Sequence, residues 1–118
     1  MIQADKDLLL RDLCARLPYG IKVEIYKDEP PYKIKGYDGK DFLSDSGWDY
    51  LIEQCKPYLF PLSSMTEEQN LEYLRTCKGG NVNVPTLASF DWLNKNHFDY
   101  RGLIEKGLAI DATWLDIY

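Results

Sequence analysis

The sequence lacks several features that would assign it to a specialised class. It contains no apolar run near the roughly eighteen residues that a membrane-spanning helix needs. Its start, MIQADKDLLL, carries acids where a secretory signal peptide would carry bases, so we expect no signal peptide. Cys14, Cys55 and Cys77 are odd in number and form no CxxC pair. The cysteine pattern indicates neither a disulfide framework nor a zinc site, and it favours the reducing cytoplasm.

A basic stripe of the kind that binds phosphates is also missing. The chain has 19 acidic and 14 basic residues, a formal net charge of −5. The first 60 residues hold 11 acids and 9 bases, and the remainder holds 8 and 5. This thin, even acidity argues against nucleic acid as the main partner, because phosphate binding depends on clustered lysine and arginine.

Reactive side chains are scarce as well. His97 is the only histidine. The three cysteines fall on predicted helices, two of them on apolar faces, where a free thiol acts as a small apolar group. Nucleophilic catalysis needs a nucleophile, a base and an orienting group together, and the sequence shows no such set. We therefore expect no catalytic residues, no metal, no cofactor and no small-molecule substrate.

The composition is that of an ordinary globular protein. Over 118 residues, 45% are apolar and 28% are charged, which predicts one domain spanning 1–118. Its first element is an amphipathic helix from Asp7 to Leu17, with Asp7/Arg11 and Asp12/Arg16 paired four residues apart. Pro18 disfavours the helical conformation of the preceding residue and ends this helix.

Alternating apolar and polar residues predict three strands after this helix. They occupy GIKVEIYK (20–27), YKIKGY (32–37) and KDFL (40–43). Asp38-Gly39 predicts a two-residue type I′ turn between the last two, because this turn needs positive φ at both positions.

The second half is predominantly helical in pattern. Trp48 to Cys55 predicts a short helix, and the prolines of KPYLFPL favour an extended run after it. A capping box of Thr66 and Gln69 predicts a helix from Glu67 to about Cys77, followed by a loop in which Gly79 is left-handed. Pro85 predicts the start of another helix, whose buried side comprises Leu87, Phe90, Leu93 and Trp92. A short helix from Tyr100 to Lys106, capped by Asp99, is predicted next. The apolar tail is expected to dock on the domain, and one interpretation makes it an edge strand.

Together these elements predict an α+β fold. It has an N-terminal helix, a three-stranded antiparallel meander, and three or four helices packed on one face of the sheet.

Three blocks of the sequence carry a resemblance. They are LCARLPYG (13–20), KPYLFPLSSMTEEQ (56–69) and DWLNKNHFDYRGLIEKGLAI (91–110). In these blocks the chain resembles a group of uncharacterised small proteins of Bacteroides-type gut bacteria and their phages and prophages. The resemblance implies a phage or mobile-element setting, in which small acidic proteins often act by binding another protein. It supplies no catalytic or binding residues.

Two surfaces are candidates for binding. The first, for a protein partner, comprises Trp92, His97, Phe98, Asp99, Tyr100 and Arg101, because tyrosine, tryptophan and arginine are enriched at interface hot spots. A simpler interpretation, which we favour for two of them, has Asp99 capping a helix and Arg101 bridging to a nearby acid. The second, for single-stranded nucleic acid, comprises Lys22, Tyr26, Lys33, Lys35 and Tyr37 on the hairpin face.

The leading functional hypothesis is therefore a non-catalytic accessory protein of a phage or mobile element. It would act by protein–protein contact or by self-association. One alternative is a nucleic-acid-associated accessory protein that uses the hairpin face. The other is a small enzyme centred on His97, whose ordinary pKa allows general base catalysis near neutral pH.

Overall fold

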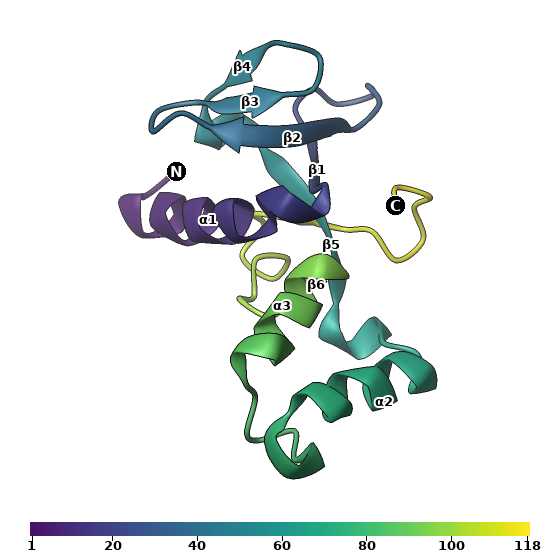
Figure 1. Cartoon of the computed structure of the whole chain (residues 1–118). Coiled ribbons are helices and arrows are strands. Elements are labelled where there is room, and N and C mark those ends of the chain that lie inside the picture. Colours follow the sequence, from purple (N-terminus) through teal and green to yellow (C-terminus); the bar gives the residue numbers. More distant parts are fainter.

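The fold is organised around one apolar strand that other strands join from distant parts of the chain (Figure 1). The computed structural model describes residues 1–118. Its helices are α1 (Gln3–Arg16), α2 (Glu67–Thr76) and α3 (Leu87–Lys95), and its strands are β1 (Lys22–Glu24), β2 (Tyr32–Tyr37), β3 (Phe42–Ser44), β4 (Asp49–Tyr50), β5 (Lys56–Pro61), β6 (Phe98–Asp99) and β7 (Ile110–Asp111). Single 3-10 turns occupy Leu17–Tyr19, Ile52–Gln54, Leu62–Ser64 and Lys78–Gly80.

The sheet is mixed in direction. Its strand order is β4-β3-β2-β1-β5-β6, with β7 also paired to β5. Strands β1 to β4 pair antiparallel in succession, and β1 pairs antiparallel with β5. Strands β6 and β7 both pair with β5 in parallel. β5 consequently has partners along its whole length, which fits its nearly continuous apolar sequence.

The buried core lies between α1 and the sheet. It is a cluster of Leu9, Leu13, Ile21, Val23, Ile34, Phe42, Tyr50, Cys55, Leu59, Leu103, Leu108 and Ala109. No residue between Leu59 and Leu103 belongs to it. The helices α2 and α3 therefore form a separate arm, visible at the bottom of Figure 1, which we call the α2–α3 lobe (residues 62–95). No helix of the chain has the length and apolar character required to cross a bilayer.

Several predictions of secondary structure are confirmed. The fold is α+β with an N-terminal helix, and the Thr66–Gln69 capping box opens α2 with both of its hydrogen bonds formed. Gly79 has a φ of 62° and lies in the left-handed region, as expected after a helix. Residues 56–61 are extended, and the tail docks on β5 as β7.

Other predictions are wrong, mostly where tertiary pairing overrides local pattern. Residues 48–55, predicted as a helix, form β4 and a 3-10 turn because residues 49–50 pair with β3. The sheet is larger than a three-stranded antiparallel meander and includes parallel pairs. Only two α-helices come after α1, both between β5 and β6, and α2 packs against α3 instead of the sheet.

Two local predictions also fail. No helix forms between Tyr100 and Lys106, where the chain makes turns. The Asp38-Gly39 connection is not a type I′ turn, because positive φ occurs at Gly39 and not at Asp38. The Asp38 carboxylate instead accepts the backbone N–H groups of Lys40 and Asp41. α3 begins with Thr86 as its N-cap, so Pro85 precedes the cap.

The separation of core and lobe predicts unequal responses to matched leucine substitutions. Leu59→Ala, in the core, should lower the free energy of unfolding by about 2–5 kcal/mol, because it opens a cavity beside α1. Leu71→Ala, on the exposed side of α2, should change it by less than about 0.5 kcal/mol. Urea denaturation followed by circular dichroism measures both. Equal losses would contradict the location of the core.

Candidate functional site

The residues predicted to bind a partner meet at a junction between α1, α3 and β6. Trp92 lies on α3, His97 joins α3 to β6, and Phe98 and Asp99 form β6. His97, Phe98 and Asp99 are buried, whereas Trp92, Tyr100 and Arg101 are half-buried. The structure therefore brings the six together, but only three of them reach the surface.

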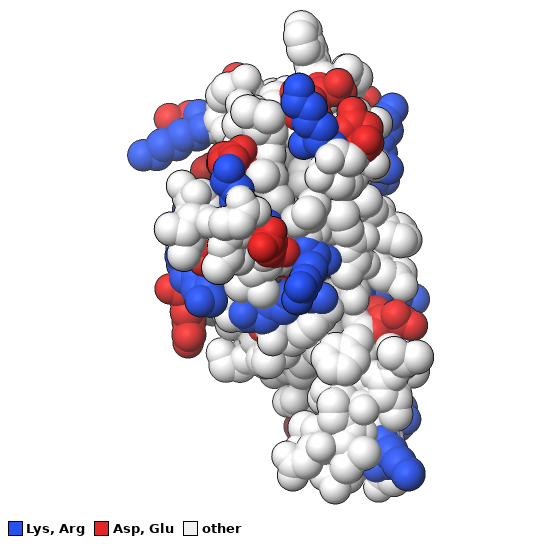
Figure 2. All heavy atoms as spheres, turned by 90° about the vertical axis from the view of Figure 1, so that its left-hand side faces the viewer, with Lys and Arg blue, Asp and Glu red and all other residues white.

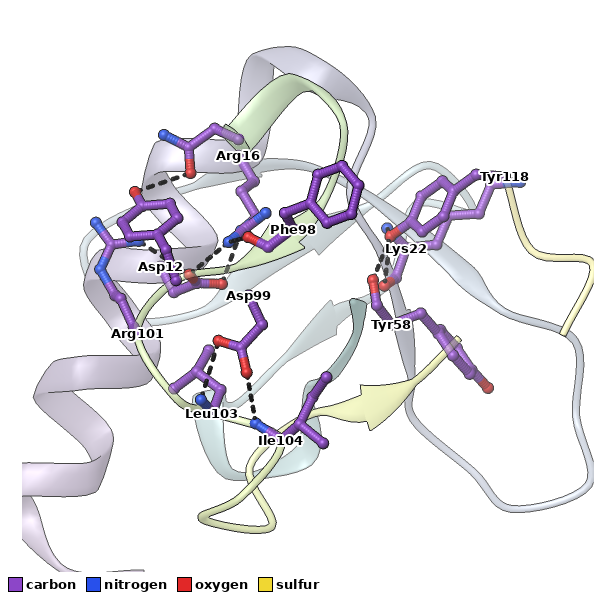
Figure 3. A network of polar contacts seen from close by, with 12 residues as sticks. Asp12, Arg16, Lys22, Tyr58, Phe98, Asp99, Arg101, Leu103, Ile104 and Tyr118 are labelled. Carbon is purple, nitrogen blue, oxygen red and sulfur yellow. Dashed lines mark hydrogen bonds and ion pairs between the residues drawn. The ribbon is translucent and has the colours of Figure 1, made fainter. Parts of the chain in front are cut away.

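A buried ionic network holds this junction together (Figure 3). The Asp12 carboxylate accepts hydrogen bonds from Arg16 Nε at 2.9 Å and from Arg16 Nη2 at 3.0 Å, and both side chains are fully buried. Arg101 Nη1 donates to the same carboxylate at 2.9 Å. Arg16 Nη2 also donates to the Phe98 carbonyl at 2.6 Å, which connects α1 to β6. A charged pair at such depth is costly unless its hydrogen bonds are made.

The Asp12–Arg16 pairing was predicted from their spacing on a helix, and the structure confirms it. The spacing gave no sign that the pair is buried or that Arg101 would join it from 89 residues away. The expectation that Arg101 bridges to an acid is confirmed, with Asp12 as that acid.

Tyr100 is fixed between the two arginines. The guanidinium carbons of Arg101 and Arg16 lie 4.5 Å and 5.5 Å from the centre of its ring, which suits a cation–π contact. Its hydroxyl donates to Asn94 Oδ1 at 3.0 Å, so the ring also connects the loop to α3. These contacts give Tyr100 a structural role at the edge of the network.

Asp99 organises the turn that follows β6. Its two carboxylate oxygens accept the backbone N–H groups of Leu103 and Ile104 at 3.0 Å and 2.9 Å. This is the chemistry predicted for a helix cap, although a turn takes the place of the helix. Because Leu103 belongs to the core, the cap aligns a core residue with the sheet.

His97 occupies a left-handed backbone position directly after α3, with a φ of 61°. Glycine is usual at this position, and histidine is one of the few other residues that adopt it more often than average. Its carbonyl accepts the Phe60 N–H at 2.8 Å, and its ring stacks on Tyr118 with centroids 3.8 Å apart. Burial, with Arg16 and Lys22 adding repulsion, lowers the pKa of His97 to about 4. The imidazole is therefore neutral at physiological pH.

Tyr118 fills a gap between two strands of the sheet (Figure 3). Its hydroxyl accepts the Lys22 N–H at 2.9 Å and donates to the Tyr58 carbonyl at 2.9 Å. The hydroxyl thereby bridges the Lys22 N–H of β1 and the Tyr58 carbonyl of β5, just beyond the last directly paired residues of the two strands. Burial raises the pKa of Tyr118. Sequence reasoning missed this residue, because nothing local distinguishes a tyrosine in a docked tail from an exposed one.

The alternative of catalysis at His97 gains no support from the cavities. Four cavities are present, and neither His97 nor any cysteine lines one of them. The three cysteines are free thiols, and burial raises the pKa of Cys55 to about 12. The buried Nδ1 atom of His97 has no hydrogen-bond partner, so no side chain orients the imidazole as a catalytic triad would require.

Only part of the set predicted to bind nucleic acid lies together on the exposed face of the sheet. Lys33 and Lys35 are exposed on β2. Lys22 lies opposite Lys33, but its ammonium donates to the Ile117 carbonyl at 2.8 Å. Tyr26 packs on Tyr50 in a separate aromatic cluster, and Tyr37 packs on Phe42 with centroids 4.7 Å apart. Two free lysines remain of the five residues.

The α2–α3 lobe carries a different candidate surface. α2 has no buried residue at all. Leu62, Leu71, Val82, Val84, Leu87 and Phe90 are all exposed, and Leu87 is 85% exposed. The prediction that α3 buries Leu87 and Phe90 is therefore wrong, whereas Leu93 is buried.

An apolar groove runs along this lobe. It has a volume of about 280 Å³ and is lined by Leu62, Met65, Asn70, Tyr73, Val82, Phe90, Leu93 and Tyr100. The surface beside it is short of charge: residues 79–90 contain no acidic or basic side chain. In Figure 2 the lower end of the molecule, which the lobe forms, is mostly free of charged atoms on the face shown.

Comparison with known proteins adds no relative. A search against protein-family models found no match, and comparisons with curated proteins and with solved structures found none either.

The buried network predicts a large loss of stability when its carboxylate is removed. Asp12→Ala should lower the free energy of unfolding by about 3–5 kcal/mol, because Arg16 would be left buried without a counter-charge. Asp7→Ala, at an exposed position of the same helix, should change it by less than about 0.5 kcal/mol. Chemical denaturation of both variants provides the measurement. A loss at Asp12 no larger than that at Asp7 would refute the role of the network.

The lowered pKa of His97 predicts that stability depends on pH. Between the unfolded pKa of about 6.5 and the folded pKa of about 4, the unfolded state binds more protons. The free energy of unfolding should therefore fall as the pH drops through this window, by at most about 3 kcal/mol.

His97→Asn is the matched variant for this test. Asparagine tolerates a left-handed backbone but does not titrate, so the variant should lose this part of the pH dependence. Urea denaturation of both proteins at several pH values between 4 and 7 measures the difference. Identical pH profiles would show that His97 does not contribute.

Proposed function

We propose that the protein is a non-catalytic interaction protein, and that its α2–α3 lobe binds a second copy of the same chain. The observation that carries this proposal is the exposed apolar surface around the groove of the lobe. The resemblance in three sequence blocks adds a phage or mobile-element setting to the proposal.

The first supporting argument is the cost of leaving this surface in water. A helix of ten residues is marginal by itself and normally gains its stability by burying one face. α2 packs on α3 through contacts such as Tyr73 on Trp92, yet it buries no residue. Large exposed apolar patches on soluble proteins commonly mark interaction sites.

The second argument concerns charge. Two copies of a chain with a net charge of −5 repel each other, so a surface that joins them should be low in charge. Residues 79–90 are the longest stretch of the sequence without a charged side chain, and they include Val82, Val84, Leu87 and Phe90. This surface therefore brings the least repulsion into a contact between copies.

The third argument is that the lobe offers both a projection and a groove. Leu87 and Phe90 are one helical turn apart on α3, and Phe90 lines the groove. A twofold axis beside the lobe would place Leu87 of each copy against the groove of the other. Such reciprocal contacts are characteristic of homodimers.

The two alternatives have less support. For nucleic-acid binding, only Lys33 and Lys35 of the predicted set have free ammonium groups. Two cations are too few for a phosphate-binding surface. An enzyme centred on His97 lacks a cavity at the imidazole.

Self-association should be visible as a concentration-dependent mass. The wild-type protein should rise from the monomer mass of 13.7 kDa towards twice that value in sedimentation equilibrium. Leu87→Asp should shift the protein to the monomer, because it buries a charge in an apolar contact. High salt should not dissociate the dimer, since the contact is uncharged.

Trp114→Asp is the matched control. Trp114 is 95% exposed in the C-terminal tail, so the same kind of substitution there should leave the dimer intact. A wild-type protein that stays monomeric at every concentration would overturn the proposal. So would a Leu87→Asp variant that still dimerises with wild-type affinity.

A further inference from the structure

The largest cavity lies at the opposite end of the molecule from the lobe, beside β4 at the top of Figure 1. It measures about 470 Å³, within the range of sites that hold small ligands or a side chain with its backbone. Its lining residues are Tyr26, Glu29, Tyr32, Ser46, Trp48, Asp49, Tyr50 and Gln54. Half of them are aromatic.

The tyrosines of the cavity contact one another. Tyr50 is buried and contacts Tyr32 with ring centroids 5.6 Å apart and Tyr26 with centroids 6.3 Å apart. Tyr26 is 49% exposed and Trp48 is 70% exposed, so a ligand in the cavity can reach both side chains. A tryptophan this exposed beside a cavity provides a large apolar area that a ligand could cover.

The charges of the cavity are all of one sign. Glu29 and Asp49 are its charged lining residues, and no lysine or arginine is among them. The Tyr32 hydroxyl donates to Glu29 Oε2 at 2.7 Å, which holds that carboxylate at the rim and leaves its second oxygen free. This hydrogen bond is the main cause that raises the pKa of Tyr32 to about 12, so the phenol stays neutral.

Further acids strengthen the negative potential. Carboxylate oxygens of Asp38, Asp41 and Asp49 lie within 4.8 Å of one another. This cluster extends the acidic surface away from the cavity on the side of Asp49. A cation that approaches the cavity is therefore attracted before it makes contact.

We propose that this cavity binds an organic cation, either a guanidinium or an alkylammonium group. Aromatic faces attract a cation through their quadrupole, and a carboxylate at the rim supplies the counter-charge. Neither an anion nor a neutral apolar group matches both features. This site is independent of the proposed self-association, because it shares no residue with the lobe.

The chain provides its own reporter for the test. Its three tryptophans lie in different places: Trp48 in the cavity, Trp92 on α3 and Trp114 in the tail. Each indole N–H gives a separate signal in a ¹⁵N-resolved NMR spectrum of the whole chain. Titration with N-acetyl-arginine methylamide or with tetramethylammonium should move the Trp48 signal and leave the other two unchanged. The citrulline analogue, a neutral isostere of arginine, should not move it.

Two variants test the chemistry of the site. Glu29→Gln/Asp49→Asn should weaken cation binding at least tenfold, and Tyr26→Leu should weaken it severalfold, while the remaining signals report an intact fold. Asp91→Asn/Asp116→Asn changes the net charge equally at positions outside the cavity, so it should bind like the wild type.

A comparison of ligands identifies the source of the cation. Tighter binding of an arginine-containing octapeptide than of the free arginine derivative would support the proposal with a protein segment as the ligand. Equal binding would support it with a free ligand. The absence of a Trp48 shift, an equal shift with the citrulline analogue, or wild-type binding by Glu29→Gln/Asp49→Asn would overturn it.

Discussion

The buried Asp12 carboxylate is the interaction on which the middle of this structure depends. It receives two arginines, one from its own helix and one from a loop far along the chain. Arg16 then reaches the Phe98 carbonyl, so the same ionic contact sets the position of β6 beside β5. An apolar pair could fill this space, but it would not fix orientation through directed hydrogen bonds. Buried ion pairs often contribute specificity of this kind in preference to stability.

The consequence for function is that the most distinctive part of the sequence lies inside the molecule. His97, Asp99 and Arg16 connect elements through buried contacts. His97 and Arg16 line no cavity, whereas Asp99 lines one of about 350 Å³. The lobe and the cavity beside β4 lie at the two ends of a molecule that is 43 Å along its longest axis. The two proposed binding surfaces therefore share no residue and lie on different elements of the chain.

The sequence was informative where local chemistry decides the structure. The Thr66–Gln69 box, the spacing of Asp12 and Arg16, and the alternation in residues 32–37 each predicted what the structure contains. Prediction failed where distant pairing decides. The pattern around Trp48 fits a helix equally well, and only pairing with β3 makes it a strand. The roles of Tyr118 and Arg101 depend on contacts 96 and 89 residues away in the chain, which no local pattern encodes.

The candidate surfaces show the same limit. An amphipathic pattern predicts that a helix buries an apolar face, and α3 does bury Leu93. The same pattern wrongly predicted burial for Leu87, because periodicity does not reveal whether the chain itself supplies the covering surface. The cavity beside β4 was missed because Tyr26, Glu29 and Trp48 meet through the pairing of β1 to β4, which places separate turns side by side.

The pairing of β5 with strands from distant parts of the chain affects when the sheet can fold during protein synthesis. Its partners come from residues 22–24, 98–99 and 110–111. The ribosome must therefore synthesise the chain as far as residue 111 before the central strand has all of its partners. Until then an apolar strand with free edges is open to pairing with other nascent chains, a state that chaperones commonly shield. The sheet around β5 is thus expected to form only after residue 111 has left the ribosome, because its pairings are distant in the chain.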